Sequence, residues 1–167
     1  LSEIGGKGLF SKQIEEELLG KKIDIAVHAL KDLPSKETDG LETKVFLKRN
    51  DPRDVFISLN SKSIHDLKAY SVIGTSSFRR AAQLAIIRKD LNIKLIRGNV
   101  DTRIQKLEQK KFDAIVLSYA GIKILGFENK ISKIFSTEEM LPSVGQGVIA
   151  LQTRKDNENV LNLISEI

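Results

Sequence analysis

Two arginines follow a glycine and three hydroxyl side chains in the segment Gly-Thr-Ser-Ser-Phe-Arg-Arg at residues 74–80. An apolar segment precedes this run and a helical pattern follows it, so we expect Gly74 at the turn between a strand and a helix. Thr75, Ser76 and Ser77 are preferred N-cap residues, and free N–H groups gather at a helix start. The planar guanidinium group of arginine can donate two parallel hydrogen bonds to a carboxylate or a phosphate. The segment therefore predicts an anion-binding site, with a capped surface helix and solvated arginines as the alternative.

A second turn of the same kind occurs in the segment Arg-Gly-Asn-Val-Asp-Thr-Arg at residues 97–103. Arg97 ends an expected strand, and Arg103 lies early in the expected helix after it. Strands that alternate with helices in this way indicate a parallel sheet with right-handed crossovers. Because parallel strands end at the same sheet edge, we expect both arginine-bearing turns to lie there. Four arginines so placed would repel one another unless an anion lay between them.

A third candidate follows the apolar segment at residues 23–28, which we expect to be a central strand of a parallel sheet. Lys31 and Asp32 come after its carboxyl end, where ligands bind in open α/β sheets. The alternative is a solvated turn before Pro34. The glycine-rich segment at residues 5–8 lacks the spacing of a P-loop and of a dinucleotide-binding loop, so it predicts no nucleotide site.

The composition narrows the classes of function. The 167 residues are 41% hydrophobic, carry a formal charge of +5 and include no cysteine. This chain therefore has no disulfide or thiolate metal site, and its two histidines are too few for a zinc site without carboxylates. The charge favours anionic partners, but aromatic residues make up only 5%, which disfavours a stacking platform for nucleic acid. No apolar run reaches the length of a membrane span, and no signal-peptide pattern is present.

The elements that position these residues follow from the hydrophobic periodicity. We expect a helix from about residues 9–11 to Gly20, and a helix after residue 77 with Phe78, Ala81, Ala82 and Ala85 on its apolar face. Further helices are expected around Ile104 and Leu107 and after Tyr119. The expected strands, besides the one already named, are residues 43–47, 55–58, 69–73, 92–97, 112–118 and 148–152.

Two aperiodic segments divide the chain. Residues 48–54 are charged and contain a proline, and residues 141–147 contain a proline and glycines, so both are expected to be crossings between lobes. A return of the strand at residues 148–152 to the first lobe would make the pair of crossings a hinge. The chain begins at Leu1 and ends within a helical pattern, so we expect both ends to be cut from a longer protein.

Six segments together resemble the porphobilinogen deaminase family, also called hydroxymethylbilane synthase. They follow the family's order along nearly the whole chain, and the combination is specific although each motif alone is not. The segments are Gly-Gly-Lys-Gly-Leu-Phe at 5–10, His-Ala-Leu-Lys-Asp-Leu-Pro at 28–34, Asn-Asp-Pro-Arg-Asp at 50–54, residues 74–80, residues 97–103, and Leu-Pro-Ser-Val-Gly-Gln-Gly at 141–147.

The resemblance implies an α/β fold with two lobes like those of a type II periplasmic binding protein, joined by hinge crossings near residues 48–53 and 142–147. Residues 1–49 and 148–167 would form part of the family's domain 1, and residues 53–142 would form domain 2. The first strand and helix of domain 1 would be missing, as would the C-terminal domain. That domain carries the cysteine that holds the dipyrromethane cofactor, so we expect this chain alone to be inactive.

The resemblance also implies a transferase of tetrapyrrole and heme biosynthesis. The family condenses four porphobilinogen molecules head to tail onto the cofactor, with loss of ammonia, to give hydroxymethylbilane. Asp32 matches the catalytic aspartate, whose carboxylate can stabilise developing positive charge and shuttle protons. Lys7, Phe10 and Gln146 match substrate-binding or loop positions. The positions that match residues binding the cofactor's acetate and propionate groups are Lys31, Thr75, Ser76, Ser77, Arg79, Arg80, Arg97, Gly98 and Arg103.

The implied partners are porphobilinogen and the growing pyrrole chain, without a metal, nucleic acid or membrane, in a cytoplasmic protein that is monomeric when complete. Two positions depart from the family pattern: Ala29 replaces a common serine, and Ser118-Tyr119 replaces small apolar residues, which bears on the local shape of the pocket. The alternative function is a non-catalytic bilobal module that binds an anion or another ligand, and Asp32 within its Lys-Asp-Leu-Pro segment favours the enzyme. Nucleic-acid binding through the net charge is a third hypothesis, and it would be steeply salt-dependent.

Overall fold

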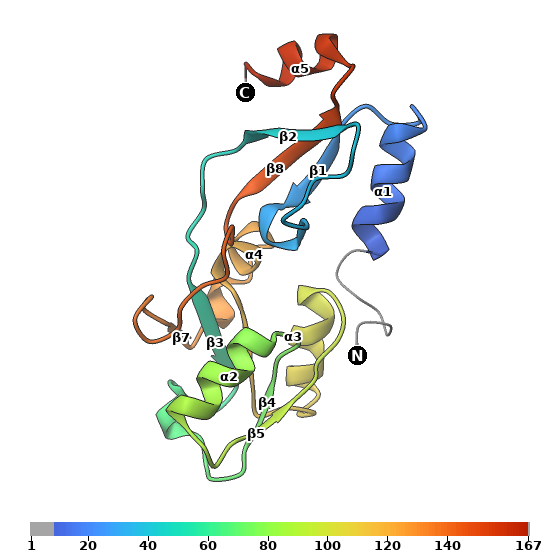
Figure 1. Ribbon diagram of the computed structural model, residues 1–167. Coiled ribbons are helices and arrows are strands. Elements are labelled where there is room, and N and C mark those ends of the chain that lie inside the picture. The colour runs from blue at the N-terminus through green and yellow to red at the C-terminus, as the bar shows by residue number, and fades with distance from the viewer. Residues whose placement is uncertain (1–8, 167) are drawn as a thin grey trace. The chain divides into compact units, whose positions relative to one another are not determined.

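The computed structural model describes residues 9–166, which form two compact units with an α/β fold (Figure 1). Unit 1 contains the described residues up to Asn50 and those from Val144 onward, and unit 2 contains Asp51–Ser143. The expected α/β class is confirmed. Within residues 9–166, no helix is both long and apolar enough to cross a membrane.

Unit 1 is built on a three-stranded antiparallel sheet. Its strands are β1 (Ala26–Ala29), β2 (Leu41–Phe46) and β8 (Ile149–Arg154), in the order β1-β8-β2. The expected central strand of a parallel sheet at residues 23–28 is therefore wrong, because among the described residues β1 pairs only with β8, and antiparallel. The apolar character of this segment has another origin, since Ile23 packs beside the buried side chain of Leu18 instead of joining the sheet.

Two helices belong to unit 1, α1 (Leu9–Leu19) and α5 (Glu158–Ile164). The inward side of α1 buries Leu18 against Ala26 and Leu41, so the expected first helix is confirmed. The helix ends at Leu19, directly before Gly20 as expected, and Lys21 adopts a positive φ of 59°. The N–H group of Lys22 then donates to the carbonyl of Glu17 and closes the helix end.

Unit 2 contains a five-stranded mixed sheet with the order β5-β4-β6-β3-β7. β4 pairs in parallel with β5 and β6, whereas β3 pairs antiparallel with β6 and β7. The expectation of a parallel sheet thus holds for β5, β4 and β6 and fails for the other two strands. The bounds are β3 (Asp54–Ser58), β4 (Val72–Gly74), β5 (Asn92–Lys94), β6 (Ala114–Ser118) and β7 (Lys133–Ile134).

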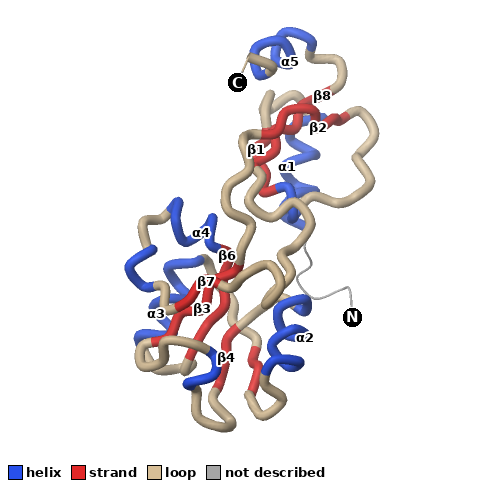
Figure 2. The backbone as a smooth tube through the Cα atoms, turned by 90° about the vertical axis from the view of Figure 1, so that its left-hand side faces the viewer, coloured by secondary structure: helices blue, strands red, loops and turns tan. Residues whose placement is uncertain are grey.

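Helices cover both faces of this sheet, as Figure 2 shows. They are α2 (Phe78–Ile87), α3 (Val100–Glu108) and α4 (Tyr119–Ile124), and there are short 3-10 turns at Ile64–Asp66 and Glu128–Lys130. Side chains alternate along β3: Phe56 packs in the cluster that contains Leu84 of α2, whereas Val55 packs in the cluster that contains Ile104 of α3. One face of the sheet therefore lies under α2 and the other under α3 and α4.

Three local expectations in unit 2 are wrong. Tyr70 has a positive φ of 65° and is exposed, so β4 begins only at Val72. The expected apolar face of α2 points to solvent, since Phe78 is 95% exposed and the helix buries Arg80 and Leu84 instead. Asp54, expected in a crossing, is the buried first residue of β3. The last two errors share one cause, because a buried carboxylate and a buried guanidinium pair with each other.

Candidate anion-binding site

The turn after β4 requires glycine and is held by its own hydroxyl groups. A Cβ atom at Gly74 would lie 2.9 Å from Phe112 and 3.2 Å from Ile96, so only glycine permits this close packing. The hydroxyl of Thr75 accepts a hydrogen bond from the N–H group of Ser77 at 3.2 Å. The hydroxyl of Ser77 accepts from the N–H group of Arg80 and caps α2. Thr75 is buried by this arrangement, and Ser76 is exposed.

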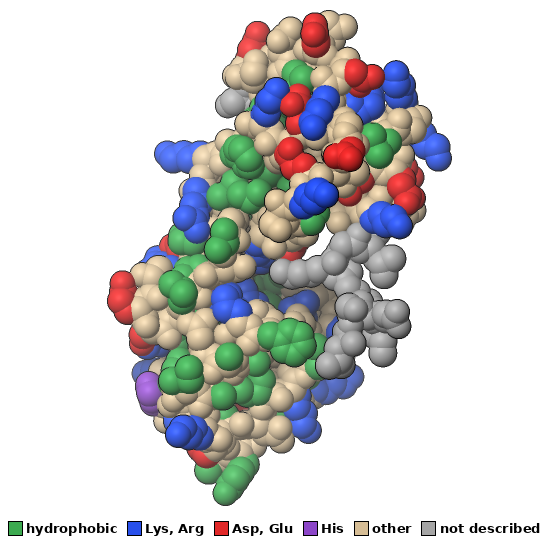
Figure 3. All heavy atoms as spheres, in the orientation of Figure 1, with side chains coloured by type: hydrophobic (Ala, Val, Ile, Leu, Met, Phe, Trp, Pro, Cys, Tyr) green, Lys and Arg blue, Asp and Glu red, His purple; other side chains and the backbone are tan. Residues whose placement is uncertain are grey.

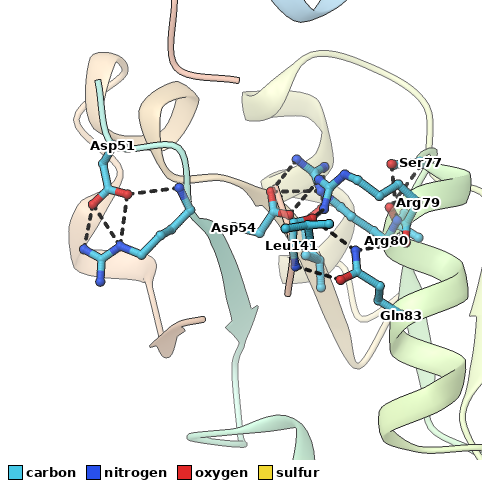
Figure 4. Close-up of polar contacts among 10 residues, drawn as sticks. Asp51, Asp54, Ser77, Arg79, Arg80, Gln83 and Leu141 are labelled. Carbon is cyan, nitrogen blue, oxygen red and sulfur yellow. Dashed lines mark hydrogen bonds and ion pairs between the residues drawn. The ribbon is translucent and has the colours of Figure 1, made fainter. Parts of the chain in front are cut away.

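Next to this turn, Arg79 and Arg80 form ion pairs with Asp54, which lies at the centre of the cluster (Figure 4). Oδ1 of Asp54 accepts hydrogen bonds from Nη2 of Arg80 at 2.8 Å and from Nε at 3.1 Å. Oδ2 accepts from Nη2 of Arg79 at 2.7 Å. The side chain of Asp54 is 0% exposed, that of Arg80 is 7% exposed and that of Arg79 is 23% exposed. A carboxylate so deeply buried requires cationic partners, and here it has two.

Backbone carbonyl groups hold the other sides of the two guanidinium groups. Nη1 of Arg80 donates to the carbonyl of Val116 on β6, and Nη1 of Arg79 donates to the carbonyl of Leu141. Gln83 secures Leu141 in turn: its Oε1 accepts from the Leu141 N–H at 2.7 Å, and its Nε2 donates to the Leu141 carbonyl at 3.1 Å. Each guanidinium group is therefore oriented from two sides (Figure 4).

The second turn adds Arg103 to the cluster. Gly98 has a φ of 118°, and a Cβ atom there would lie 2.7 Å from the Thr102 side chain. Nε of Arg103 donates to the Gly98 carbonyl at 2.7 Å. Burial lowers the pKa of the Arg103 guanidinium, and the nearby positive charge of Arg80 lowers it further. The two arginine-bearing turns thus lie within electrostatic reach, as expected for the adjacent ends of the parallel strands β4 and β5.

Arg97 does not join the cluster. Its side chain is exposed and makes no hydrogen bond or ion pair within residues 9–166, while its carbonyl accepts from Nζ of Lys106 at 2.6 Å. Three arginines and one carboxylate remain, with a formal charge of +2. The prediction that the arginines repel one another unless they bind an external anion is therefore only partly correct, because the carboxylate of Asp54 already lies between Arg79 and Arg80. The residual charge and the helix start still favour an external anion.

Lys31 and Asp32 lie in unit 1, in a short 3-10 turn, Leu30–Asp32, that directly follows β1. Asp32 is exposed and Lys31 is partly buried. The turn is held by a hydrogen bond from the Leu30 N–H to the Val148 carbonyl at 3.0 Å. Gly145 packs against Leu30 so closely that a Cβ atom would lie 2.9 Å from Leu30 Cγ, and its φ is 70°.

Gln146 belongs to the same part of unit 1 and is buried, and its carbonyl accepts from Nε of Arg49 at 3.1 Å. The structure therefore brings Lys31, Asp32 and the segment around Gln146 together in unit 1. It groups Thr75, Ser76, Ser77, Arg79, Arg80, Gly98 and Arg103 in unit 2. Phe10 falls within α1, and Lys7 lies outside the described residues.

Ala29 and Ser118-Tyr119, the two positions that depart from the family pattern, are paired or packed within their own units. Ala29 ends β1 and pairs with Ile149. Ser118 ends β6, where it pairs with Asp54 and where its hydroxyl oxygen would lie 3.1 Å from a Cβ atom at Gly121. Tyr119 begins α4 and packs against the cluster around Ile104. Ser118 is therefore the cross-strand neighbour of Asp54, the residue at the centre of the ion-pair cluster.

Sequence reasoning missed Asp54 and Gln83. The signal for Asp54 was its position at the head of the apolar strand segment Val-Phe-Ile, where a charged side chain must find a partner. No comparable signal marks Gln83, because its partner Leu141 lies 58 residues away in the sequence. On the face drawn in Figure 3, acidic and basic side chains are interspersed over unit 1 and form no continuous basic surface there.

The chain matches one family model along almost its whole length: the description "Porphobilinogen deaminase, dipyromethane cofactor binding domain" applies to residues 1–162. Porphobilinogen deaminase from Syntrophomonas wolfei is 51% identical over 167 residues, which cover 100% of this chain and 55% of the relative. The protein of the same name from Rickettsia prowazekii is 52% identical, with 100% and 56% covered, and that from Bacillus subtilis is 48% identical, with 99% and 53% covered. The chain spans about half the length of the curated relatives that it matches.

Solved structures of lower identity share the fold. A putative lipoprotein from Actinomyces odontolyticus superposes with a TM-score of 0.59 at 16% identity, covering 92% of this chain and 72% of that one. A Salmonella typhimurium periplasmic binding protein with high arginine specificity gives a TM-score of 0.53 at 16% identity, covering 90% and 67%. These likenesses confirm the expected fold, with two units like those of periplasmic binding proteins, and they show nothing beyond the fold.

Proposed function

The chain belongs to the porphobilinogen deaminase family, and from that premise we propose that it is part of a hydroxymethylbilane synthase. In this proposal the complete protein condenses four porphobilinogen molecules head to tail, with loss of ammonia, to give hydroxymethylbilane for tetrapyrrole and heme synthesis. The observation that carries the proposal is the net-positive arginine cluster beside the hydroxyl-capped start of α2. Porphobilinogen bears acetate and propionate groups, and guanidinium forks suit such carboxylates.

The residues present fit a dipyrromethane with the same carboxylate groups. The proposed contacts are the guanidinium groups of Arg79, Arg80 and Arg103, with Lys31, Ser76, Ser77 and Arg97 as further donors and Thr75 and Gly98 shaping the turns. A bound dipyrromethane supplies the pyrrole carbon to which the next porphobilinogen is joined. Because this chain has no cysteine, the attachment site of the cofactor lies outside these 167 residues.

Asp32 is the proposed catalytic residue. Its carboxylate is exposed on the 3-10 turn after β1, so a substrate can reach it. A fixed negative charge stabilises the positive charge that develops when ammonia leaves, and a carboxylate can also accept and return a proton. Lys31, next to it, would bind a substrate carboxylate. Lys7, Phe10 and Gln146 are proposed to contact substrate or to shape its loop.

The domain assignment and the cellular setting are further parts of the proposal. Unit 1 would correspond to part of the family's domain 1 and unit 2 to its domain 2, with the two connections acting as a hinge. We propose a cytoplasmic protein that is monomeric when complete and that binds neither nucleic acid nor membranes. Cell fractionation and size-exclusion chromatography of the complete protein test these points.

A chimera tests the proposed function directly. In Bacillus subtilis porphobilinogen deaminase, the matched segment is replaced by residues 1–167 of this chain, and porphobilinogen consumption and ammonia release are measured. The chimera should be active, and Asp32→Asn in the chimera should lower kcat by at least a hundredfold, because it removes the charge while keeping the shape. Asp39→Asn, at another exposed aspartate of unit 1, is the control. A folded chimera whose Asp32→Asn variant keeps activity within a few-fold of the parent would remove Asp32 from catalysis.

A further inference from the structure

Asp54 occupies a fixed place in unit 2 that the proposed chemistry does not explain. It is the first residue of β3, in register with Ser118 of β6, and its carbonyl accepts from the N–H group of Phe135 at 3.0 Å. The backbone on both sides is therefore held by the sheet. Because this backbone is fixed, the Asp54 carboxylate is held in one position. Side chains that bind this carboxylate are therefore held in place as well.

The two oxygens of this carboxylate divide between two neighbouring arginines. Oδ1 receives Nε and Nη2 of Arg80, and Oδ2 receives Nη2 of Arg79. Consecutive residues in the first turn of a helix point in directions about 100° apart, so their side chains do not meet without a common partner. Asp54 is that partner, and it fixes the separation and orientation of the two guanidinium planes.

Without Asp54, the side chains of Arg79 and Arg80 would not be held in an orientation suited to binding a carboxylate ligand. Long arginine side chains lose rotamer freedom when they bind a ligand, and this loss weakens the binding. A buried carboxylate that orders them before the ligand arrives removes that cost. The cluster of Arg79, Arg80, Arg103 and Asp54 also keeps a formal charge of +2, so Asp54 orders the arginines without cancelling their attraction for an anion.

We propose that Asp54 is a positioning residue for carboxylate recognition, which holds Arg79 and Arg80 in the orientation that binds the acetate and propionate groups that porphobilinogen and the dipyrromethane share. The inference rests on the proposed function for the class of ligand. A purely electrostatic role makes the opposite prediction. If Asp54 merely lowered the positive charge, its removal would raise the cluster charge to +3 and strengthen the binding of every anion.

Two variants separate these roles. Asp54→Asn removes the charge with little change in shape, and Asp54→Glu keeps the charge but moves the carboxylate by one methylene. Positioning predicts that both variants weaken porphobilinogen binding by at least tenfold, measured by calorimetric titration of residues 1–167. A charge effect alone predicts tighter binding for Asp54→Asn and unchanged binding for Asp54→Glu. Either of those results would overturn the proposal, and having two variants protects the test against misfolding of one.

Asp51→Asn provides the matched control. Asp51 lies in the same segment of unit 2 and forms its own ion pair with Arg53, with Nη2 and Oδ2 2.6 Å apart (Figure 4). The hydrogen bonds and the ion pair of Asp51 are made with Arg53 and not with Arg79 or Arg80, so their loss should leave porphobilinogen affinity within twofold of the parent. A tenfold loss in Asp51→Asn as well would attribute the effect to a general perturbation of unit 2 and contradict a specific role for Asp54.

A spectroscopic measurement tests the positioning without any ligand. The Nε–H signal of Arg80, which donates to Asp54, should exchange slowly with water in the parent and much faster in Asp54→Asn. Unchanged exchange would overturn the proposal. If residues 1–167 bind no porphobilinogen, the exchange measurement by itself decides whether Asp54 positions the arginines, and the proposed function is decided separately by the activity of the chimera.

Discussion

Replacement of Arg80 by methionine measures how much the buried ion pair stabilises unit 2. Methionine retains an apolar stem and removes the charge, so packing changes little. The variant loses the contacts of Arg80 with Oδ1 of Asp54 at 2.8 and 3.1 Å, together with the bond to the Val116 carbonyl. Asp54 remains buried and retains its ion pair with Arg79.

The expected magnitude follows from these contacts. Two charge centres about 4 Å apart attract each other by about 4 kcal/mol at an effective dielectric constant of about 20. Removal of one partner of a buried pair costs about 3–5 kcal/mol. Two effects offset part of this loss. The variant no longer has the repulsion between Arg80 and Arg103. It also has one cation fewer in the first turn of α2, which stabilises the folded state by about 0.3–1 kcal/mol. We therefore expect the free energy of unfolding to fall by about 2–4 kcal/mol.

Urea denaturation followed by tyrosine fluorescence is the suitable assay. The chain has no tryptophan and two tyrosines, Tyr70 and Tyr119, and both lie in unit 2, so the signal reports on the unit that contains the ion pair. Lys130→Met is the control, because its ion pair with Glu108 is partly exposed and should contribute less than about 1 kcal/mol.

A double variant identifies the partner. Asp54→Asn combined with Arg80→Met should cost less than the sum of the two single changes, by about 1–3 kcal/mol. A loss for Arg80→Met no larger than that for Lys130→Met would refute the reasoning. Strict additivity in the double variant would show that the two side chains do not stabilise unit 2 through each other.

Three more outcomes are expected. Gly145→Ala should lower the melting temperature more than Gly126→Ala. Both glycines have a φ near 70°, but an added Cβ atom would lie 2.9 Å from Leu30 Cγ at Gly145 and would meet nothing within 4 Å at Gly126; equal shifts would contradict the contact. Hydrogen bonds from Arg53 lower the pKa of Asp51, so the pair stabilises the folded chain above the ordinary value of 3.8 and the contribution is lost as the pH falls through the lowered value. The stability difference between the parent and Asp51→Asn, measured by urea denaturation, should therefore be constant near neutral pH and shrink below pH 3.8; a constant difference down to pH 3 would argue against the pair. The intact-protein mass should match 18.6 kDa without an added dipyrromethane, because the chain has no cysteine; a mass increase equal to two pyrrole units would contradict this.

The parts of the fold that sequence predicted are those determined by neighbouring residues. Ile104 and Leu107 marked the buried face of α3, since their spacing matches one helix face whichever elements that face packs against. The glycine turn and hydroxyl cap before α2 were likewise predictable from consecutive residues. The membership of Arg80 and Arg103 in one cluster followed from the parallel pairing of β4 and β5.

The parts that sequence did not predict depend on pairs that are distant in the chain. Asp54 and Arg80 are separated by 26 residues, and no local pattern shows that they meet. The prediction that Phe78 and the alanines form the buried face of α2 failed for the same reason, because Arg80 is buried on that helix through its pairing with Asp54. The antiparallel pairing of β1 with β8 joins residues about 120 positions apart, and hydrophobicity alone carries no information on that partner.

The position of β8 between β1 and β2 also determines the order in which a ribosome can complete the two units. Unit 2 is a continuous stretch of chain, so all its strands have been synthesised before β8 is made. β1 and β2 are synthesised early, but among the described residues each pairs with β8 and not with the other. The sheet of unit 1 must therefore wait for residues 149–154, and its pairing carries a high contact order, which slows folding. The unpaired edges of β1 and β2 during this interval would expose the nascent chain to aggregation and to binding by chaperones. A released chain that ended before residue 149 would contain all strands of unit 2 but would leave β1 and β2 unpaired and open to proteolysis.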